Sequence, residues 1–472
     1  MQATVRDLSV LLLSTYDLGH QPLGLASPAA WLREMGAQVT CRDLAVDELD
    51  ESEVAAADLV AFHLPMHAAT RLAVPLAERV RSLNPRAHLC FYGLYAPVNE
   101  SFLRKLGAQT ILGGEYEHGL ADLYGRLSAA PDGYAGPQAE PVISLVRQDF
   151  RTPDRTGLPG LDRYAYLSIG GGRRAVGYTE ATRGCKHTCR HCPIVPVYGG
   201  KFRAIARDVV LADVRQQVQA GAAHITFGDP DFFNAPGHAL RLVTALHEEF
   251  PWLSYDVTIK IEHLVKQARH LRTLRETGCM FVTSAVEAVD DAILERLDKR
   301  HTRADLEFVV SGFRATRLTL SPTFVAFTPW TTTQGYIDLL DTIHRLGLVA
   351  AVAPVQYAIR LLIPAGSRLM ELEEVRDLVG DFDAAALVFP WSHPDPEVDE
   401  LQREVMALVA AVAPGDDRAG VFARIRELAY ARAGRAAPAI EPGAAGGCED
   451  VPRLSEPWYC CAEPIESQLS SC

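Results

Sequence analysis

The sequence has no long apolar run and no cluster of basic residues. No stretch approaches the roughly 18 uncharged apolar residues that a membrane span requires, and the short run Leu8–Leu13 is flanked by Asp7 and Asp17. Such a run is typical of a first β-strand and not of a secretory signal. The formal net charge is −13 and the arginines are scattered, which argues against a surface for nucleic-acid phosphates. We therefore expect neither a membrane nor a nucleic acid as a partner.

No export signal accompanies the ten cysteines. In a chain of 472 residues without such a signal, reduced thiols and metal ligation are more common than disulfides, so we expect a cytoplasmic protein. The hydrophobic fraction of 48% and the charged fraction of 22% are ordinary for globular proteins. The length predicts two or three domains.

Residues 1–125 alternate short apolar strands with helical segments. The strands are expected at Leu8–Ser14, Gln38–Arg42, Leu59–His63, His88–Tyr92 and Gln109–Leu112. Amphipathic stretches such as Pro28–Met35 and Leu72–Leu83 lie between them. This alternation predicts an α/β domain with a doubly wound parallel sheet, which binds its ligands at the carboxyl ends of the strands.

Residues 126–174 are rich in Pro, Gly, Ala and Asp without a sustained period, and we interpret them as a linker. The alternation resumes over 175–368. Six strands are expected there, at Val176–Thr182, His224–Asp229, Ser254–Lys260, Phe281–Glu287, Thr323–Thr328 and Val355–Ile363. Six β/α units predict a partial (β/α)6 barrel of the TIM type. A helical region over 369–435 and a cysteine-containing tail over 436–472 follow.

The densest group of thiols, Cys185, Cys189 and Cys192, follows the first expected barrel strand. Three thiolates within eight residues can hold one iron–sulfur cube if the backbone loops around it, and Gly184 and Pro193 suit such a loop. Three ligands leave the fourth iron open to chelate a substrate-like molecule. This pattern predicts a [4Fe-4S] cluster.

A zinc site is the alternative interpretation of the same residues. His187 or His191 could supply a fourth ligand. Zinc, however, usually recruits four protein ligands in paired spacing, and a free-standing zinc knuckle would not require the preceding strand. We therefore favour the cluster.

The motif Cys185-x-x-x-Cys189-x-His191-Cys192 resembles the CxxxCxΦC signature of the radical S-adenosylmethionine (SAM) superfamily. His191 takes the position at which that family has an aromatic residue facing the SAM adenine. The resemblance implies that a reduced cluster donates one electron to SAM, that a C–S bond of SAM breaks, and that the resulting carbon radical attacks a substrate. It also implies an electron donor of the flavodoxin or ferredoxin type.

The resemblance extends to residues near the ends of later strands. The candidates for cofactor binding are His191, Gly228, Asp229, Asp231, Lys260, Ser284, Glu287 and Arg360. The two aspartates suit the SAM ammonium, which needs oxygen acceptors. Ser284 and Glu287 suit the ribose or the amino acid end of SAM, and the lysine and the arginine suit the SAM carboxylate or a substrate anion. Each polar residue alone could instead cap a helix or end a solvated strand.

The first domain resembles the cobalamin-binding domains that precede the barrel in many radical SAM enzymes. The segment Gly113–Glu117, which looks like a sixth strand, adds to this likeness. The DxHxxG motif that supplies a cobalt ligand is absent, because Asp17, His20 and Gly24 have the wrong spacing. We favour an empty, repurposed domain, while cobalamin without a protein ligand stays possible. His20, His63 and His67 could line the groove, although a lone histidine is more often structural.

The tail carries Cys448, the adjacent pair Cys460 and Cys461, and Cys472. The segment WYCCAEP over 458–464 resembles the tail of the CUAEP/CCAEP-tail radical SAM (seleno)proteins. A related cysteine-tailed group contains the arsinothricin-forming enzyme, which joins arsenite to a 3-amino-3-carboxypropyl group taken from SAM. Adjacent cysteines are strained disulfide partners but good soft ligands, so Cys460, Cys461 and Cys472 are candidate catalytic ligands of a thiophilic element. The alternative is a flexible tail without a function.

Three hypotheses follow for the function. The first is an enzyme that transfers a SAM-derived carbon group to an inorganic substrate such as As(III) held by the tail. The second is a 5′-deoxyadenosyl-radical enzyme that acts on a small organic substrate, with cobalamin as a methyl carrier. The third is a non-catalytic metal or redox sensor on the same scaffold. Cys41, Cys90 and Cys279 lie in apolar contexts and are expected to be ordinary buried residues.

Overall fold

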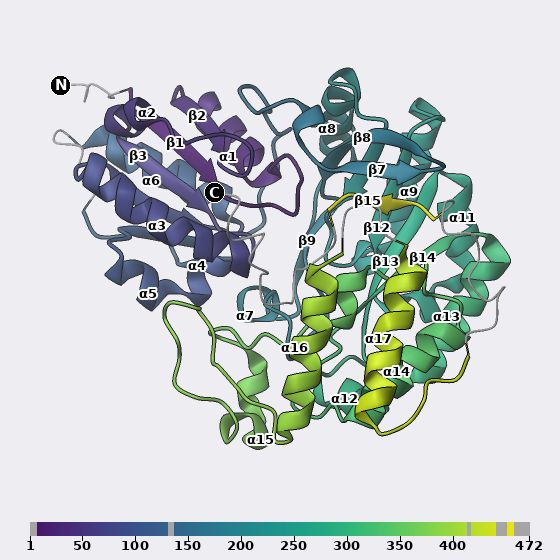
Figure 1. The fold of residues 1–472 in the computed structure, drawn as a ribbon. Coiled ribbons are helices and arrows are strands. Elements are labelled where there is room, and N and C mark those ends of the chain that lie inside the picture. Colours follow the sequence, from purple (N-terminus) through teal and green to yellow (C-terminus); the bar gives the residue numbers. More distant parts are fainter. Residues whose placement is uncertain (1–6, 131–135, 413–416, 440–450, 457–472) are drawn as a thin grey trace.

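The computed structural model describes residues 7–130, 136–412, 417–439 and 451–456, and two α/β units lie side by side in it (Figure 1). The N-terminal unit is built around a six-stranded sheet. The larger unit holds a seven-stranded sheet with helices outside it. No helix in the described part of the chain is long and apolar enough to cross a membrane.

The N-terminal sheet is parallel throughout, with the order β2-β1-β3-β4-β5-β6. Its strands are β1 (Ser9–Ser14), β2 (Gln38–Asp43), β3 (Leu59–His63), β4 (His88–Tyr92), β5 (Thr110–Gly114) and the short β6 (Ile143–Ser144). Its helices are α1 (Leu23–Glu34), α2 (Glu51–Ala56), α3 (His67–Leu83), α4 (Tyr95–Val98), α5 (Glu100–Lys105) and α6 (Tyr116–Ala129). Separate apolar clusters fill the two faces of this sheet, one under α1 and α6 and the other under α3. The doubly wound parallel sheet is confirmed.

The structure differs from the expected element boundaries of this unit in two places. Helix α1 begins five residues before Pro28, although a proline inside a helix removes the hydrogen bond to the carbonyl four residues earlier. That carbonyl, on Gly24, instead accepts a hydrogen bond from the hydroxyl of Tyr92 at 2.8 Å, so the helix continues through the proline. The segment Gly113–Glu117 ends β5 and starts α6, and the sixth strand is β6, within the stretch expected to be a linker.

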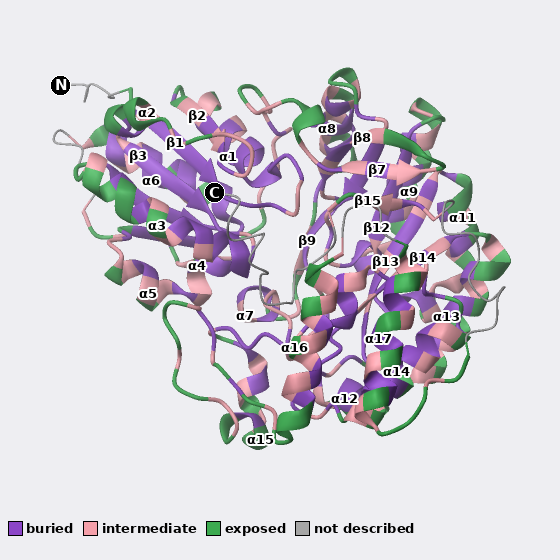
Figure 2. Ribbon diagram, in the orientation of Figure 1, coloured by how far each residue is buried: buried purple, intermediate pink, exposed green. Residues whose placement is uncertain are grey.

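The second sheet has the order β14-β13-β12-β11-β8-β7-β15. Its parallel strands are β8 (Gly172–Thr179), β11 (His224–Phe227), β12 (Ser254–Thr258), β13 (Cys279–Glu287) and β14 (Thr319–Phe324). The antiparallel strands β7 (Tyr166–Ile169) and β15 (Arg453–Leu454) extend one edge. Figure 2 shows these strands as largely buried beneath a partly exposed layer of helices. The partial barrel is therefore confirmed.

Helices alternate with the barrel strands and continue towards the C-terminus. They are α7 (Val195–Tyr198), α8 (Arg207–Gln219), α9 (Pro236–Glu249), α10 (Ile261–Lys266), α11 (Leu271–Glu276), α12 (Asp291–Arg296), α13 (Arg303–Thr316), α14 (Thr333–Arg345), α15 (Glu373–Arg376), α16 (Pro396–Ala410) and α17 (Arg418–Arg432). Short 3-10 turns are η1 (Leu161–Arg163), η2 (Phe232–Asn234), η3 (Ala268–His270), η4 (Pro354–Tyr357) and η5 (Arg368–Glu371). Buried residues of α16 and α17 belong to the same apolar core as the barrel, so these helices pack on it.

The sixth barrel strand, expected at Val355–Ile363, is not formed. The segment starts with the turn η4, whose first residue is Pro354, and then makes a single parallel bridge between Phe327 and Arg360. The Phe327 N–H donates to Ile359 O at 3.0 Å, and the Leu361 N–H donates to Phe327 O at 2.8 Å. The apolar residues of the run are buried all the same, which is why the sequence looked like a strand.

Candidate active site

The three-thiol loop lies between two short paired strands. β9 (Thr182–Gly184) pairs antiparallel with β10 (Phe202–Ala204), and the loop occupies the start of the segment between them. Asp229 fixes the entry, because its carboxylate accepts hydrogen bonds from Ala181 N at 2.8 Å and from the Thr182 hydroxyl at 2.6 Å. Gly184 has a φ of +74°, and a Cβ there would lie 2.3 Å from the Tyr198 ring. The backbone therefore turns at Gly184 in a way that a larger residue would obstruct.

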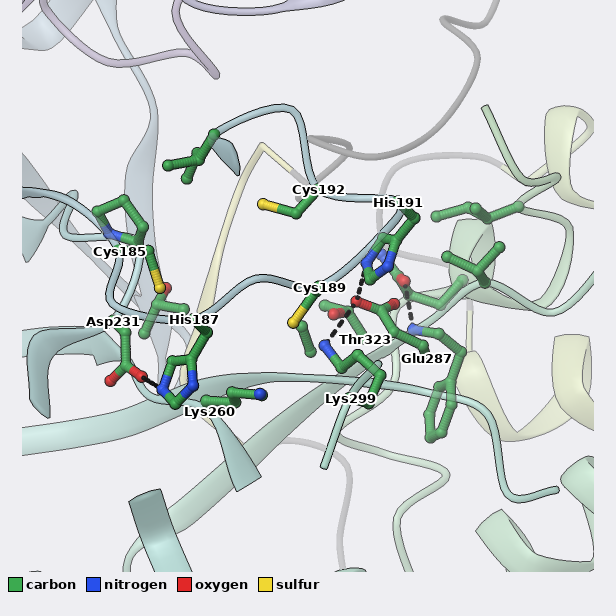
Figure 3. A pocket seen from close by; sticks show the side chains of 18 residues that line it. Cys185, His187, Cys189, His191, Cys192, Asp231, Lys260, Glu287, Lys299 and Thr323 are labelled. Atoms are coloured by element: carbon green, nitrogen blue, oxygen red, sulfur yellow. Dashed lines mark hydrogen bonds and ion pairs between the residues drawn. The ribbon is translucent and has the colours of Figure 1, made fainter. Parts of the chain in front are cut away.

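Cys185, Cys189 and Cys192 line one cavity, and their sulfur atoms face the same space (Figure 3). The cavity encloses about 820 Å³ outside protein atoms, the space at its open mouth included. Burial, followed by the negative charge of Asp231, raises the pKa of Cys185 to about 12. At neutral pH this thiol stays protonated until a metal displaces the proton, so thiolate formation is coupled to metal binding.

The three sulfurs are not arranged around a single ion. Ligands of one zinc, with Zn–S bonds of about 2.3 Å, lie within roughly 4 Å of one another. Among the described residues, the group whose ligand atoms all lie within 4.8 Å is Cys185, His187 and Asp231, and not the three thiols. Spread sulfurs suit a cube in which each thiolate binds its own iron. The residues thus fit a [4Fe-4S] cluster better than the zinc alternative.

One wall of the cavity beside Cys185 carries a network of charged and imidazole groups. The Asp231 carboxylate lies 2.6 Å from His263 Nδ1 and 3.4 Å from His187 Nε2. Burial alone would raise the pKa of Asp231, but the adjacent imidazoles of His187 and His263 hold it below its usual range. On the same wall, Lys260 Nζ lies 3.2 Å from Glu262 Oε2. The wall thus presents both an anion and a cation to a ligand.

The opposite wall is organised by Glu287, at the end of β13. Its Oε1 lies 3.1 Å from His191 Nε2 and 3.2 Å from Lys299 Nζ, and all three side chains are buried. Burial would raise the pKa of this carboxyl, but the charge of Lys299 and the hydrogen bond with His191 lower it to about 2. Glu287 is therefore an anion, and it holds the ring of His191 in place at the cavity surface.

Four of the predicted cofactor-binding residues do not line this cavity. Gly228 packs against Tyr178, whose hydroxyl would lie 1.8 Å from a Cβ at that position. Asp229 is engaged with the start of the cluster loop, and burial raises its pKa to about 7. Ser284 is fully buried on the other face of β13 from Ala285, which lines the cavity. Of the candidates, the cavity brings together His191, Asp231, Lys260 and Glu287 with the three thiols.

Arg360, the fourth of these, points towards the C-terminal helical region. Its guanidinium lies 2.6 Å from Asp399, donates to Trp391 O at 2.6 Å and stacks 3.6 Å from the centre of the Trp391 ring. The expected contact with a ligand anion is therefore not available to it in this arrangement, and its role is to join the barrel to helix α16.

Three residues at the site were missed by the sequence reasoning. Lys299 follows the expected strand Phe281–Glu287, but no pattern distinguishes it from its charged neighbours. His263 is the third residue of helix α10, and its contact with Asp231 links two different β/α units. Gln356 also lines the cavity, and its side chain accepts a hydrogen bond from Phe324 N at 2.9 Å.

The remaining cysteines divide into two groups. Cys41, Cys90 and Cys279 are buried in the apolar cores, as expected, and burial raises their pKa values. Cys448, Cys460, Cys461 and Cys472 lie outside the described residues. The predicted catalytic role of the tail thiols therefore stays a prediction.

The three histidines expected near the groove of the N-terminal unit are packed within the protein. His20 stacks on Tyr178 with ring centres 4.8 Å apart, and His67 Nε2 lies 2.8 Å from Ala386 O. Burial lowers the pKa of His63 to about 3 and that of His20 and His67 to about 4. They are neutral side chains that do not line the cavity.

Comparisons with known proteins agree with this geometry. Residues 179–318 match the family described as the Radical SAM superfamily. The chain is 24% identical over 335 residues to the hopanoid C-3 methylase of Methylococcus capsulatus, an alignment that covers 68% of this chain and 64% of that enzyme. The chain thus spans less than two thirds of the length of this relative.

The fold is similar to that of two solved radical enzymes. One is OxsB, a cobalamin-dependent S-adenosylmethionine radical enzyme, with a TM-score of 0.65 and 13% identity over 90% of this chain and 72% of that chain. The other is TsrM, a radical SAM methyltransferase from Kitasatospora setae, with a TM-score of 0.56 and 16% identity over 72% of this chain and 73% of that chain. At these identities the likeness concerns the fold. The superfamily match contains all three thiols of the loop, and this part of the chain is therefore similar to the Radical SAM superfamily.

Proposed function

We propose that the enzyme transfers a SAM-derived carbon group to a small substrate bound in the cavity beside the three thiols. The observation that carries this proposal is that Cys185, Cys189 and Cys192 line the same cavity as the charged side chains of Lys260 and Glu287. Cys185, Cys189 and Cys192 would hold the cluster, which would supply one electron for breaking a C–S bond of SAM. An electron donor of the flavodoxin or ferredoxin type is part of the same proposal.

The protein's own residues bind, orient and shield the reactants. Asp231 and Glu287 are buried anions that suit an ammonium or ribose hydroxyls, and Lys260 suits a carboxylate. Ala285, Val325 and other apolar residues line the space between them. Such a lining limits the access of water, which would otherwise compete for a reactive carbon radical.

The comparisons favour the organic-substrate hypothesis over the arsenic hypothesis. The relative from Methylococcus capsulatus is named a methylase, and TsrM is named a methyltransferase. These names describe those proteins, and they support a methyl or related one-carbon transfer here as a proposal. Arsenic chemistry rests on the tail thiols, which lie outside the described residues. The sensor hypothesis gains no support from any of these findings.

OxsB is a cobalamin-dependent enzyme and the TsrM structure contains cobalamin, and the shared fold supports cobalamin as a further cofactor. The described residues of the N-terminal unit, however, fit it poorly. Tyr16 and Asp17 after β1 are each less than 10% exposed, as are Glu115 and Glu117 after β5. A face that waits for a large flat cofactor would be exposed in its absence. We therefore derive no step through cobalamin.

The test is a product analysis under anaerobic conditions. The reconstituted enzyme is incubated with dithionite and SAM, with and without hydroxocobalamin and with and without arsenite, and SAM-derived products are identified by mass spectrometry. 5′-Deoxyadenosine formed independently of arsenite supports the organic-substrate proposal. Methylthioadenosine together with an arsenic-bearing amino acid, lost in Cys461→Ser, would replace it with the arsenic hypothesis.

A matched pair of variants shows whether the cavity is the reaction site. Lys260→Met alters a charged residue that lines the cavity, whereas Arg360→Gln alters a charged residue beside Trp391 and outside the cavity. We expect SAM cleavage to fall in Lys260→Met and to stay near the original rate in Arg360→Gln. The reverse order would contradict the proposed location.

A further inference from the structure

Three buried side chains converge beside the cluster loop: His187 within that loop, Asp231 after β11 and His263 in α10. Each of them is less than 10% exposed. Asp231 Oδ2 lies 2.6 Å from His263 Nδ1. It also lies 3.4 Å from His187 Nε2, a contact that Figure 3 shows at the cavity wall. Segments that are far apart in the sequence thus bring one carboxylate oxygen and two imidazole nitrogens together.

These three atoms are close to one another, yet none of them is satisfied by a hydrogen bond. In the described part of the chain, Asp231 Oδ2, His187 Nε2 and His263 Nδ1 are buried and have no partner at hydrogen-bonding angles. Unpaired buried polar atoms are costly, and native proteins commonly resolve such groups with a water molecule or an ion. A cation placed among the three atoms would satisfy all of them at once.

The spacing and the chemistry of the three atoms suit an ion of the zinc type. Bonds of about 2.0–2.2 Å to nitrogen and oxygen place two ligands of one ion roughly 2.8–3.6 Å apart. The 3.4 Å separation lies in this range, and a small side-chain shift brings the 2.6 Å separation into it. Two imidazoles and one carboxylate are a ligand set that enzymes use for zinc, and they leave a fourth position open.

The surrounding residues hold two of these ligands in the orientation that a metal requires. The other oxygen of Asp231, Oδ1, accepts a hydrogen bond from Phe233 N at 3.0 Å, so Oδ2 is turned towards the histidines. The other nitrogen of His187, Nδ1, lies 3.4 Å from Glu262 Oε2. A carboxylate behind a metal-binding histidine is the usual arrangement in metalloproteins, because it fixes the ring and makes it a stronger ligand.

From this arrangement we propose that His187, Asp231 and His263 bind one divalent metal ion of the zinc type, at a site separate from the cluster. The Cys185 sulfur and ligand atoms of His187 and Asp231 lie within 4.8 Å of one another, but that thiol belongs to the cluster. His187 and Asp231 line the cavity, so the open position of the ion is reached from it. The ion would hold an oxygen donor of a bound molecule there, which leaves Glu287 as the anion for an ammonium. This last role rests on the proposed function, whereas the metal site itself does not.

The experiment measures zinc in the full chain after its cluster has been reconstituted, so that the three thiols of the loop are occupied by iron. Zinc chloride is added under anaerobic conditions, the unbound ion is removed on a desalting column, and the metal content is measured by mass spectrometry. X-ray absorption at the zinc edge then identifies the ligand atoms. The cluster absorbance and the iron content show for each variant whether the protein is correctly folded.

We expect about one zinc ion per chain, with nitrogen and oxygen ligands and the outer-shell scattering of imidazole. Glu262→Gln, which alters only the residue behind His187, should weaken zinc binding by roughly 10–100-fold, and His263→Gln should weaken it further. His301→Gln is the matched control and should retain the zinc. His301 is a buried histidine of the same barrel that lies outside the cavity, with its Nε2 3.2 Å from Val286 O.

Three results would overturn the metal site. They are zinc bound only by sulfur, equal zinc in the wild type and in His263→Gln, and a cluster-loaded wild type that retains no zinc. The last of these would assign the three unpaired atoms to a water molecule. None of these results depends on SAM cleavage, so the metal site and the proposed function fail independently of each other.

Discussion

Replacing Glu287 with glutamine tests the electrostatic organisation of the cavity. The carboxyl is buried between Lys299 and His191, and these partners lower its pKa from 4.5 to about 2. A carboxyl whose pKa falls by that amount on folding stabilises the folded chain by about 3 kcal/mol at neutral pH. This contribution is complete above pH 4.5, the ordinary pKa, and is lost as the pH falls towards about 2.

In Glu287→Gln this stabilisation is absent at neutral pH, and the difference should be visible in hydrogen exchange of the β13 and β14 amides of the cluster-free chain. A destabilisation of about 3 kcal/mol accelerates exchange through the opened state by roughly 150-fold. Glu307→Gln is the matched control, because it removes the same charge from an exposed ion pair with Arg345, 2.6 Å apart. Such an exposed, solvent-screened pair contributes little to stability, so Glu307→Gln should change exchange only slightly. An acceleration in Glu287→Gln no larger than in Glu307→Gln would refute the reasoning.

Three further predictions concern Asp229 and Gly184, beside the cluster loop, and Arg360, outside the cavity. Burial raises the Asp229 pKa to about 7. The protonated carboxyl therefore contributes fully to the stability of the folded chain below the ordinary pKa of 3.8, and this contribution is lost as the pH rises to about 7. Urea unfolding should show the wild type losing about 1.4 kcal/mol per pH unit relative to Asp229→Asn between pH 5 and 7, and parallel curves would contradict this. Gly184→Ala should lower the iron bound on reconstitution severalfold, whereas Gly199→Ala, with no atom within 4 Å of its Cβ, should retain most of it. Arg360→Gln should lower stability by about 1–3 kcal/mol through its lost partners Asp399 and Trp391, yet leave the affinity for SAM unchanged in a binding titration.

Most of the fold follows from short-range pattern. Every strand of the N-terminal sheet from β1 to β5 was expected within about two residues, because buried parallel strands form continuous apolar runs between helices. The failure at Val355–Ile363 has the same origin. A buried apolar run satisfies the pattern of a strand even where a turn at Pro354 leaves a single bridge, and periodicity does not separate the two cases.

The site could be predicted in part, and the division has a physical reason. The cysteine spacing is local, so the cluster loop is evident from sequence. Side-chain direction depends on the pleat of each strand, and neighbouring residues on a strand point to opposite faces. Ala285 lines the cavity and Ser284 therefore points away from it, while the register of β13 shifts between Ala285 and Glu287, an irregularity that the sequence does not show. Lys299 and Glu287 are 12 residues apart with helix α12 between them, and no local pattern predicts their pairing.

The most direct test of the central claim is electron paramagnetic resonance of the anaerobically reconstituted and reduced chain. We predict about four irons and four sulfides per chain, a reduced-cluster signal that changes shape when SAM is added, and loss of that signal in Cys189→Ala. The change on SAM addition reports an open iron that three thiol ligands leave free. A chain that binds zinc in place of the cluster, gives no signal, or gives a signal that SAM does not alter would contradict the account.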